Sequence, residues 1–145
     1  MTRRISGYDI AKRQTSAALR EFVQADAAAE TKLHCAIVKL IEASKVPGVV
    51  AIHCPNGGKR SKREAAIFKA MGVRAGVPDL IIWQPGGITR FIEIKTPRGI
   101  VSSAQIEFFN AMRRNGHECS VVRSLDEAAA LLTEWGVIRC VRMAA

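Results

Sequence analysis

The chain has 145 residues, of which 48% are hydrophobic and 24% are charged, a composition typical of a globular protein with a single core. Lys and Arg number 22 against 13 Asp and Glu, and the formal net charge of +9 favours a polyanionic partner, either nucleic acid or an anionic membrane. No run approaches the roughly 20 apolar residues that span a bilayer. The basic start has no apolar segment behind it and is therefore no signal peptide, so we expect a cytoplasmic protein.

The first half of the chain is predicted to be mainly helical. Residues 1–14 are basic and are expected to form a flexible arm. Residues 15–44 are rich in Ala, Leu, Glu and Lys, which predicts a helix with a break near Asp26. Next come a predicted strand at 49–54, a basic loop at 55–63 and a short helix at 64–71 that Gly72 closes.

The second half predicts a mixed sheet with covering helices. Strands at 79–83 and 89–95 are joined by the turn QPGG. The remaining predicted elements are a helix at 102–115, a strand at 119–124, a helix at 125–135 and a last strand at 137–143. This order predicts one α/β domain over residues 15–145, with a central mixed β-sheet flanked by helices.

The predicted hairpin gathers charged side chains at one end of the sheet. Side chains alternate along a strand, so Glu93 and Lys95 share one face while Ile92 and Ile94 take the other. The turn brings Asp79 beside them. Two close carboxylates repel unless a cation lies between them, and hard oxygen ligands suit Mg²⁺ or Mn²⁺. The alternative is a solvated ion pair on an outer face, with Asp79 as a turn residue.

Two polar helix residues each have two interpretations. Glu30 lies three residues before Leu33 on the apolar side of the long helix, where a carboxylate needs a partner; alternatively, it stabilises the first turn of a helix capped by Asp26. Gln105 completes a capping box with Ser102. We expect that one rotamer of Gln105 does not easily serve both this cap and a site.

Cysteines and histidines offer a weak metal pattern. The four cysteines, Cys35, Cys54, Cys119 and Cys140, show no CxxC, and free thiols are the default in a reducing compartment. Three of them lie close to a histidine in the sequence. Adjacent residues point apart, so His34-Cys35 and His53-Cys54 can each supply only one ligand to a common zinc site, and zinc is the minor alternative.

Four segments in a fixed order carry a family resemblance: HCPNGGKR, GVRAGVPDL, FIEIKTPRG and SSAQ. They resemble the VRR-NUC family of the PD-(D/E)XK nuclease superfamily, in its small stand-alone type, over roughly residues 30–132. The resemblance implies a restriction-endonuclease-like fold in a bacterial or phage-encoded protein. It implies catalytic roles for Glu30, Asp79, Glu93, Lys95 and Gln105. It also implies that Asp79, Glu93 and the Ile94 carbonyl bind Mg²⁺ or Mn²⁺, with Glu30 acting through a water.

The basic loop is the second candidate site. Such a run is commonly a solvated loop, but glycines let backbone amides approach a phosphate, and the matching family segment contacts substrate. We therefore expect DNA binding by a set of polar and basic residues: Asn56, Lys59, Arg60, Lys62 and Arg63. A membrane would need an amphipathic basic helix instead, so we expect no membrane partner.

The resemblance implies a metal-dependent DNA endonuclease without an organic cofactor. Branched DNA such as a four-way (Holliday) junction is the expected substrate, and cutting it symmetrically needs a homodimer, since one domain offers one site. The C-terminal stretch supplies interface candidates, although packing on the chain's own core is equally compatible: Trp135, Val137, Ile138 and Val141. The alternatives are a non-catalytic nucleic-acid-binding module and a monomeric flap or single-strand nuclease.

Overall fold

The computed structural model describes residues 7–55 and 61–139, with side chains from residue 19 onward. Within these residues the chain forms four helices and a four-stranded sheet of order β1-β2-β3-β4, in which the first two pairings are antiparallel and β3 pairs with β4 in parallel. The predicted mixed α/β sheet is therefore confirmed. The elements are α1 (Gly7–Ser44), β1 (Val50–His53), α2 (Lys62–Ala70), β2 (Leu80–Gln84), β3 (Ile88–Ile94), α3 (Ser103–Arg114), β4 (Glu118–Val122) and α4 (Leu125–Glu134).

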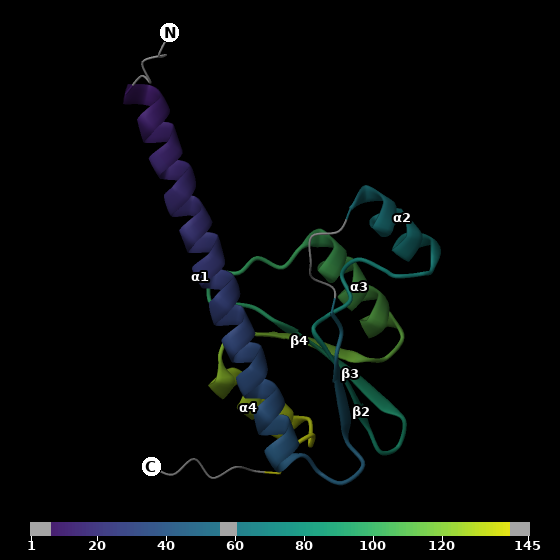
Figure 1. Cartoon of the computed structure of the whole chain (residues 1–145). Coiled ribbons are helices and arrows are strands. Elements are labelled where there is room, and N and C mark those ends of the chain that lie inside the picture. The colour runs from purple at the N-terminus through teal and green to yellow at the C-terminus, as the bar shows by residue number, and fades with distance from the viewer. Residues whose placement is uncertain (1–6, 56–60, 140–145) are drawn as a thin grey trace, which may run out of the picture.

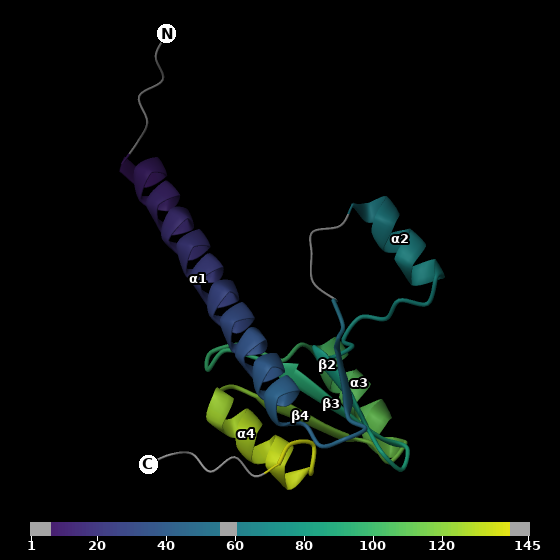
Figure 2. The same cartoon turned by 60° about the horizontal axis from the view of Figure 1, so that its bottom comes forward.

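Helices cover both faces of the sheet (Figures 1 and 2). Helices α1 and α4 lie on one face, and α3 lies on the other. The α1–α4 face contains the larger core, where Ile92 and Ile94 of β3 pack with Ile37 of α1 and Leu132 of α4. A smaller cluster around Phe91 lies under α3. Because both faces are covered, every residue from position 91 to 94 of β3 is buried.

Helix α1 is longer than the sequence pattern predicts. It begins at Gly7 rather than near Thr15, and it continues through Asp26 without a break, so both expectations are wrong. After Gly7 the segment contains no Gly or Pro, and its Ala-rich middle favours continuation of the helix. The N-terminal part of α1 extends past the sheet, away from the rest of the domain (Figure 1).

The C-terminal segment packs on the domain's own core. Trp135, Val137 and Ile138 are 9%, 0% and 2% exposed, and residues 137–139 form only an isolated bridge between Lys45 and Ile138 rather than a strand. The amide of Val46 donates to the carbonyl of Val137, which ties this segment to the end of α1. These three residues are therefore core residues and not an exposed interface, while Val141 lies outside the described residues.

Helix α2 begins inside the predicted basic loop. Ser61 caps it in a capping box with Glu64, so Lys62 and Arg63 belong to its first turn instead of a loop. All residues of α2 are exposed or nearly so, and the helix stands off from the sheet (Figure 2).

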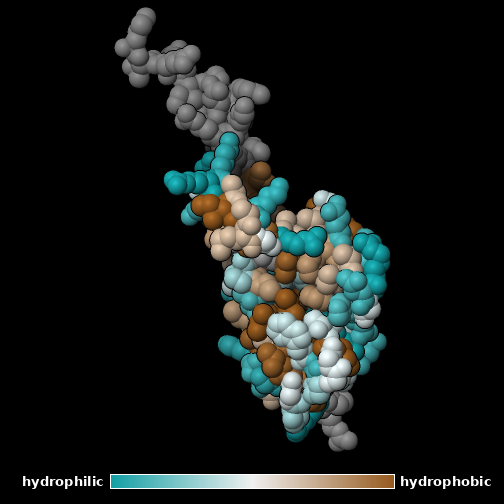
Figure 3. All heavy atoms as spheres, turned by 90° about the vertical axis from the view of Figure 1, so that its right-hand side faces the viewer, coloured by the Kyte–Doolittle hydropathy of each residue, from teal (hydrophilic) through white to brown (hydrophobic). Residues whose placement is uncertain are grey.

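On the face that Figure 3 shows, hydrophobic side chains appear among hydrophilic ones. No helix within the described ranges is both long enough and apolar enough to cross a bilayer.

Candidate active site

The hairpin of β2 and β3 brings Asp79 beside Glu93. Leu80 pairs with Ile92, so Asp79, one residue before β2, lies opposite the end of β3. The amide of Ile94 donates a 2.8 Å hydrogen bond to Asp79 Oδ2, and this bond holds the carboxylate against the strand. The proximity predicted from the QPGG turn is confirmed.

Glu93 is a buried carboxylate, not a solvated one. Only 2% of its surface is exposed, because α3 covers this face of the sheet. Its Oε1 lies 2.7 Å from Lys95 Nζ and accepts a hydrogen bond from Gln105 Nε2. The solvated outer-face interpretation of Glu93 and Lys95 is therefore excluded.

Gln105 serves the helix cap and the acidic site at once. Its Oε1 accepts a 2.8 Å hydrogen bond from the Ser102 amide, and its own amide donates to Ser102 Oγ at 3.2 Å. The side-chain Nε2 meanwhile donates to Glu93. Our expectation that one rotamer does not easily serve both is wrong, because the acceptor and the donor of a carboxamide point in different directions.

A glycine next to α3 makes this placement feasible, and sequence reasoning missed it. Gly76 has a φ of +83°, and a Cβ added there would lie 2.2 Å from the carbonyl oxygen of Ala104. Since the obstructing atoms are backbone atoms at the start of α3, a side chain at this position would displace the helix end that carries Gln105. Gly76 is the second glycine of GVRAGVPDL, and it was the signal in the sequence for this close contact with α3.

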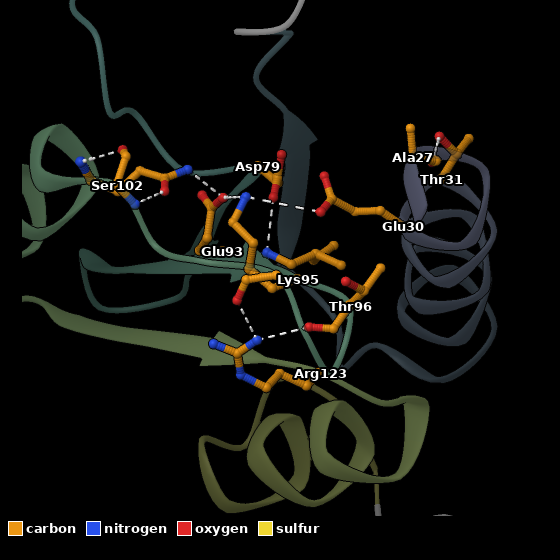
Figure 4. A network of polar contacts seen from close by, with 12 residues as sticks. Ala27, Glu30, Thr31, Asp79, Glu93, Lys95, Thr96, Ser102 and Arg123 are labelled. Atoms are coloured by element: carbon orange, nitrogen blue, oxygen red, sulfur yellow. Dashed lines mark hydrogen bonds and ion pairs between the residues drawn. The ribbon is translucent and has the colours of Figure 1, made fainter. Parts of the chain in front are cut away.

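Glu30 approaches the same cluster from α1. Its Oε2 lies 3.9 Å from Lys95 Nζ, and Figure 4 shows Lys95 and Asp79 between Glu93 and Glu30. Because α1 continues through Asp26, Glu30 is in mid-helix and not in a first turn capped by Asp26. The interpretation based on the helix dipole is therefore excluded.

The cluster holds three carboxylates and one ammonium group. Burial raises the pKa of both Glu93 and Glu30 above 4.5, and the neighbouring Asp79 charge adds to the rise. Burial alone would lower the pKa of Lys95, but the surrounding carboxylates outweigh it and raise that pKa instead. The site therefore has an excess of negative charge, which a divalent cation on oxygen ligands would relieve. The predicted ligand role of the Ile94 carbonyl stays a prediction.

The loop that follows Lys95 is held by a residue the sequence analysis did not single out. Arg123 Nη1 donates to the carbonyls of Thr96 and Gly99, both at 2.7 Å (Figure 4). At Gly99 an added Cβ would lie 3.1 Å from Lys95 Cδ. Arg123 therefore holds the loop after Lys95, and Gly99 leaves space for the lysine side chain.

Two open pockets flank the cluster. One, of about 420 Å³, is lined by Glu30 and Asp79 together with His34 and His53. The other, of about 720 Å³, lies between α2 and the start of α3 and includes Lys69, Arg74 and Gln105 in its lining. A ligand in the first pocket could therefore reach Glu30 and Asp79, and one in the second could reach Gln105.

The predicted DNA-binding residues are only partly described. Lys62 and Arg63 are exposed on the first turn of α2, whereas Asn56, Lys59 and Arg60 lie outside the described residues. Cys35, Cys54 and Cys119 are free thiols, as expected.

Comparison with known proteins gives a consistent picture. A family model for the VRR-NUC domain matches residues 14–126. A solved structure titled "VRR_NUC domain protein" is 27% identical, with a TM-score of 0.60 over 73% of this chain and 86% of the other. A second, titled "VRR_NUC domain", is 21% identical, with a TM-score of 0.51 over 73% and 96% of the two chains, and shows a shared fold. No curated protein matches the chain.

Proposed function

This chain belongs to the VRR-NUC domain family, which has a nuclease-type fold, and from that premise we propose that it is a divalent-metal-dependent DNA endonuclease acting on branched DNA such as four-way junctions. The observation that carries the proposal is the buried Glu93 beside Asp79. A binding module would gain nothing from buried acids facing a phosphate, since like charges repel.

The residues fit Mg²⁺ or Mn²⁺ by the chemistry of their donors. Asp79, Glu93 and the Ile94 carbonyl would hold the ion, with Glu30 acting through a water or on a second ion. When bound, the cation supplies positive charge near the phosphate and makes a neighbouring water more acidic. Mg²⁺ prefers oxygen donors of this kind, and its positive charge would balance the excess negative charge of the three carboxylates.

The chain's own side chains supply the remaining parts of the reaction. Lys95 carries a raised pKa, so its ammonium keeps its proton at neutral pH and can orient a water and shield charge on the phosphate. Gln105 fixes Glu93 through one hydrogen bond, which preserves the site's geometry before substrate arrives. Preorganisation of this kind reduces the cost of reorganising the site during reaction.

Basic residues at the start of α2 and in the segment before it are the proposed source of DNA affinity. Lys62 and Arg63 are exposed at the start of α2, and two cations in the first turn oppose the helix dipole, which suggests a role other than helix stability. Together with Asn56, Lys59 and Arg60 they form the proposed phosphate-binding segment. Contacts of this kind orient the duplex without reading its sequence.

The branched substrate requires two sites, and a homodimer is the simplest source. One domain with one metal site cuts one strand, whereas symmetric cutting of a junction needs two sites related by a twofold axis. The test is cleavage of labelled duplex, flap, single-stranded and four-way junction DNA with Mg²⁺, Mn²⁺ or EDTA, alongside light scattering. Paired symmetric cuts by a dimer support the proposal in full.

Other outcomes select the alternatives. Cutting of flaps or single strands by a monomer would leave a nuclease of a different substrate class. Tight DNA binding without any cleavage in either metal would show a non-catalytic module.

A further inference from the structure

Two histidines and an aspartate converge beside the acidic cluster. His34 of α1, His53 at the end of β1 and Asp79 before β2 each offer a ligand atom, and these atoms lie within 4.8 Å of one another. The sequence pattern limited each His-Cys pair to one ligand. The structure supplies the histidine of each pair and adds a carboxylate that the pattern did not suggest.

Backbone pairing explains why His53 and Asp79 meet. His53 pairs with Leu80 in the antiparallel β1–β2 ladder, and the Cys54 amide donates to the Asp79 carbonyl at 2.9 Å. Packing of α1 then brings the His34 ring edge-on to the His53 ring, with 4.4 Å between centroids. The convergence therefore rests on helix α1, the end of strand β1 and the residue directly before strand β2.

A hydrogen bond fixes the tautomer of His53. Its Nδ1 lies 3.0 Å from the backbone oxygen of Asp79. A carbonyl oxygen can only accept, so Nδ1 carries the hydrogen and Nε2 keeps a free lone pair. Metal-binding histidines usually have this arrangement, in which the second ring nitrogen donates to a carbonyl or carboxylate.

One carboxylate oxygen of Asp79 is available as a ligand, and the pocket beside it has space for an ion. The Ile94 amide occupies Oδ2, while Oδ1 accepts no hydrogen bond from any residue that the structure describes. All three side chains line the open pocket of about 420 Å³. A bound ion would keep a position open to water or another ligand.

We propose that His34, His53 and Asp79 form a second metal site that binds a first-row transition-metal ion, with Zn²⁺ as its best-suited occupant. Two imidazoles and one carboxylate suit a borderline ion, whereas Mg²⁺ prefers oxygen donors alone. This site shares Asp79 with the proposed nuclease site, whereas its two histidine ligands belong to it alone. It does not depend on the chain being a nuclease.

The histidines provide a matched test, because the chain has three. His117 lies away from the site, edge-on to Phe91. Zn²⁺ affinity of the full chain is measured by competition with a chromogenic chelator, and by titration with Co²⁺ as a spectroscopic probe. We expect His34→Ala and His53→Ala each to weaken Zn²⁺ binding at least about 10- to 100-fold, and His117→Ala to bind like the wild type.

Two more variants separate this site from its neighbours. The double variant Cys35→Ser/Cys54→Ser and the variant Glu93→Ala should keep Zn²⁺ affinity, and Co²⁺ should show no thiolate charge-transfer band. Thermal melting checks each fold, and His34→Gln and His53→Gln replace any alanine variant that does not fold. Wild-type Zn²⁺ affinity in the folded histidine variants would overturn the proposal. A thiolate band, or a loss confined to Glu93→Ala, would do the same. No cleavage is measured, so failure of the proposed nuclease would leave the result intact.

Discussion

The two faces of β3 are equally buried but carry side chains of opposite character, apolar on one face and charged on the other. Ile92 and Ile94 are fully buried against α1 and α4, whereas Glu93 between them is 2% exposed and faces α3. A step of one residue along a strand changes the face. Strand β3 therefore supplies the core with one face and presents a carboxylate with the other.

The two faces differ in their effect on stability. Burying an isoleucine side chain stabilises a fold by about 1.5–3 kcal/mol. Burying an ionised carboxylate is unfavourable unless partners compensate. Among residues 7–55 and 61–139, Glu93 has Lys95 and Gln105 as partners, with two other acids nearby. Such an arrangement is typical of a functional site that stability alone would not select.

The largest expected effect comes from removing an acid of the cluster around Glu93. Asp79→Ala or Glu93→Ala should lower single-turnover cleavage at least about 1,000-fold, because each would lose a ligand of the ion. DNA affinity, followed by fluorescence anisotropy, should survive. Glu118→Ala is the control, since Glu118 is an exposed acid paired with Arg90. Cleavage by either active-site variant at the rate of this control would remove the proposed site.

Loss of the ammonium group should have the next largest effect. Lys95→Ala should slow cleavage about 100- to 1,000-fold while Mn²⁺ binding, measured by calorimetry, is largely retained, because the lysine acts on water and phosphate. Lys45→Ala, which affects an ion pair with Glu42 at the C-terminal end of α1, should cut normally. If Lys95→Ala cuts as fast as Lys45→Ala, the lysine has only a structural role.

On the opposite face, a truncation should affect stability and leave the chemistry unchanged. Ile92→Ala should lower the free energy of unfolding by about 2–5 kcal/mol, because it leaves a cavity in the larger core. Urea denaturation measures this loss. The remaining folded protein, assayed at low temperature, should cleave at the wild-type rate. A loss below about 1 kcal/mol would mean that this face is not the main core.

The pH dependence of stability sharpens the comparison further. The folded-state pKa of Glu93 is raised by burial, so its contribution to the stability of the metal-free protein is most favourable below the unfolded pKa and is lost as the pH rises through the folded pKa. Glu93→Gln cannot titrate. Its melting temperature should therefore rise relative to that of the wild type as the pH increases through the folded-state pKa of Glu93. A constant difference between the two proteins would contradict the raised pKa.

The smallest effect should come from the basic segment after β1. If Lys59 and Arg60 contact phosphates, replacing both with Ala should weaken binding to all DNA sequences about equally. The dependence of log affinity on log salt should become shallower by up to about two units. An unchanged slope would show that these side chains are only solvated.

Local rules were sufficient to predict the centre of the site. Strand alternation and the QPGG turn place Asp79 beside Glu93, and both rules act over a few residues. They do not reveal which helix covers Glu93. The contacts of Gln105 and Glu30 with this cluster depend on how α3 and α1 pack, and for these residues the sequence supported two interpretations each.

The sequence left the outcome open, or predicted it wrongly, where tertiary packing or helix propensity decided it. Trp135, Val137 and Ile138 lie in the core because the segment after α4 docks on the end of α1, a contact between residues far apart in the sequence. The start of α1 was misplaced because basic residues were interpreted as a flexible arm. The His34–His53 convergence likewise depends on how α1 packs beside β1, which the spacing of the pairs does not encode.

The central claim is that Asp79 and Glu93 hold the ion on which cleavage depends. The most direct measurement titrates Mg²⁺ into EDTA-treated protein that is already bound to the labelled DNA it cuts fastest, while cleavage and anisotropy are followed in the same samples. The account predicts no cleavage without the ion, a rate that rises to saturation with Mg²⁺ for the wild type but not for Glu93→Gln, and unchanged DNA binding throughout. Cleavage in EDTA, or the same Mg²⁺ response in Glu93→Gln, would contradict it.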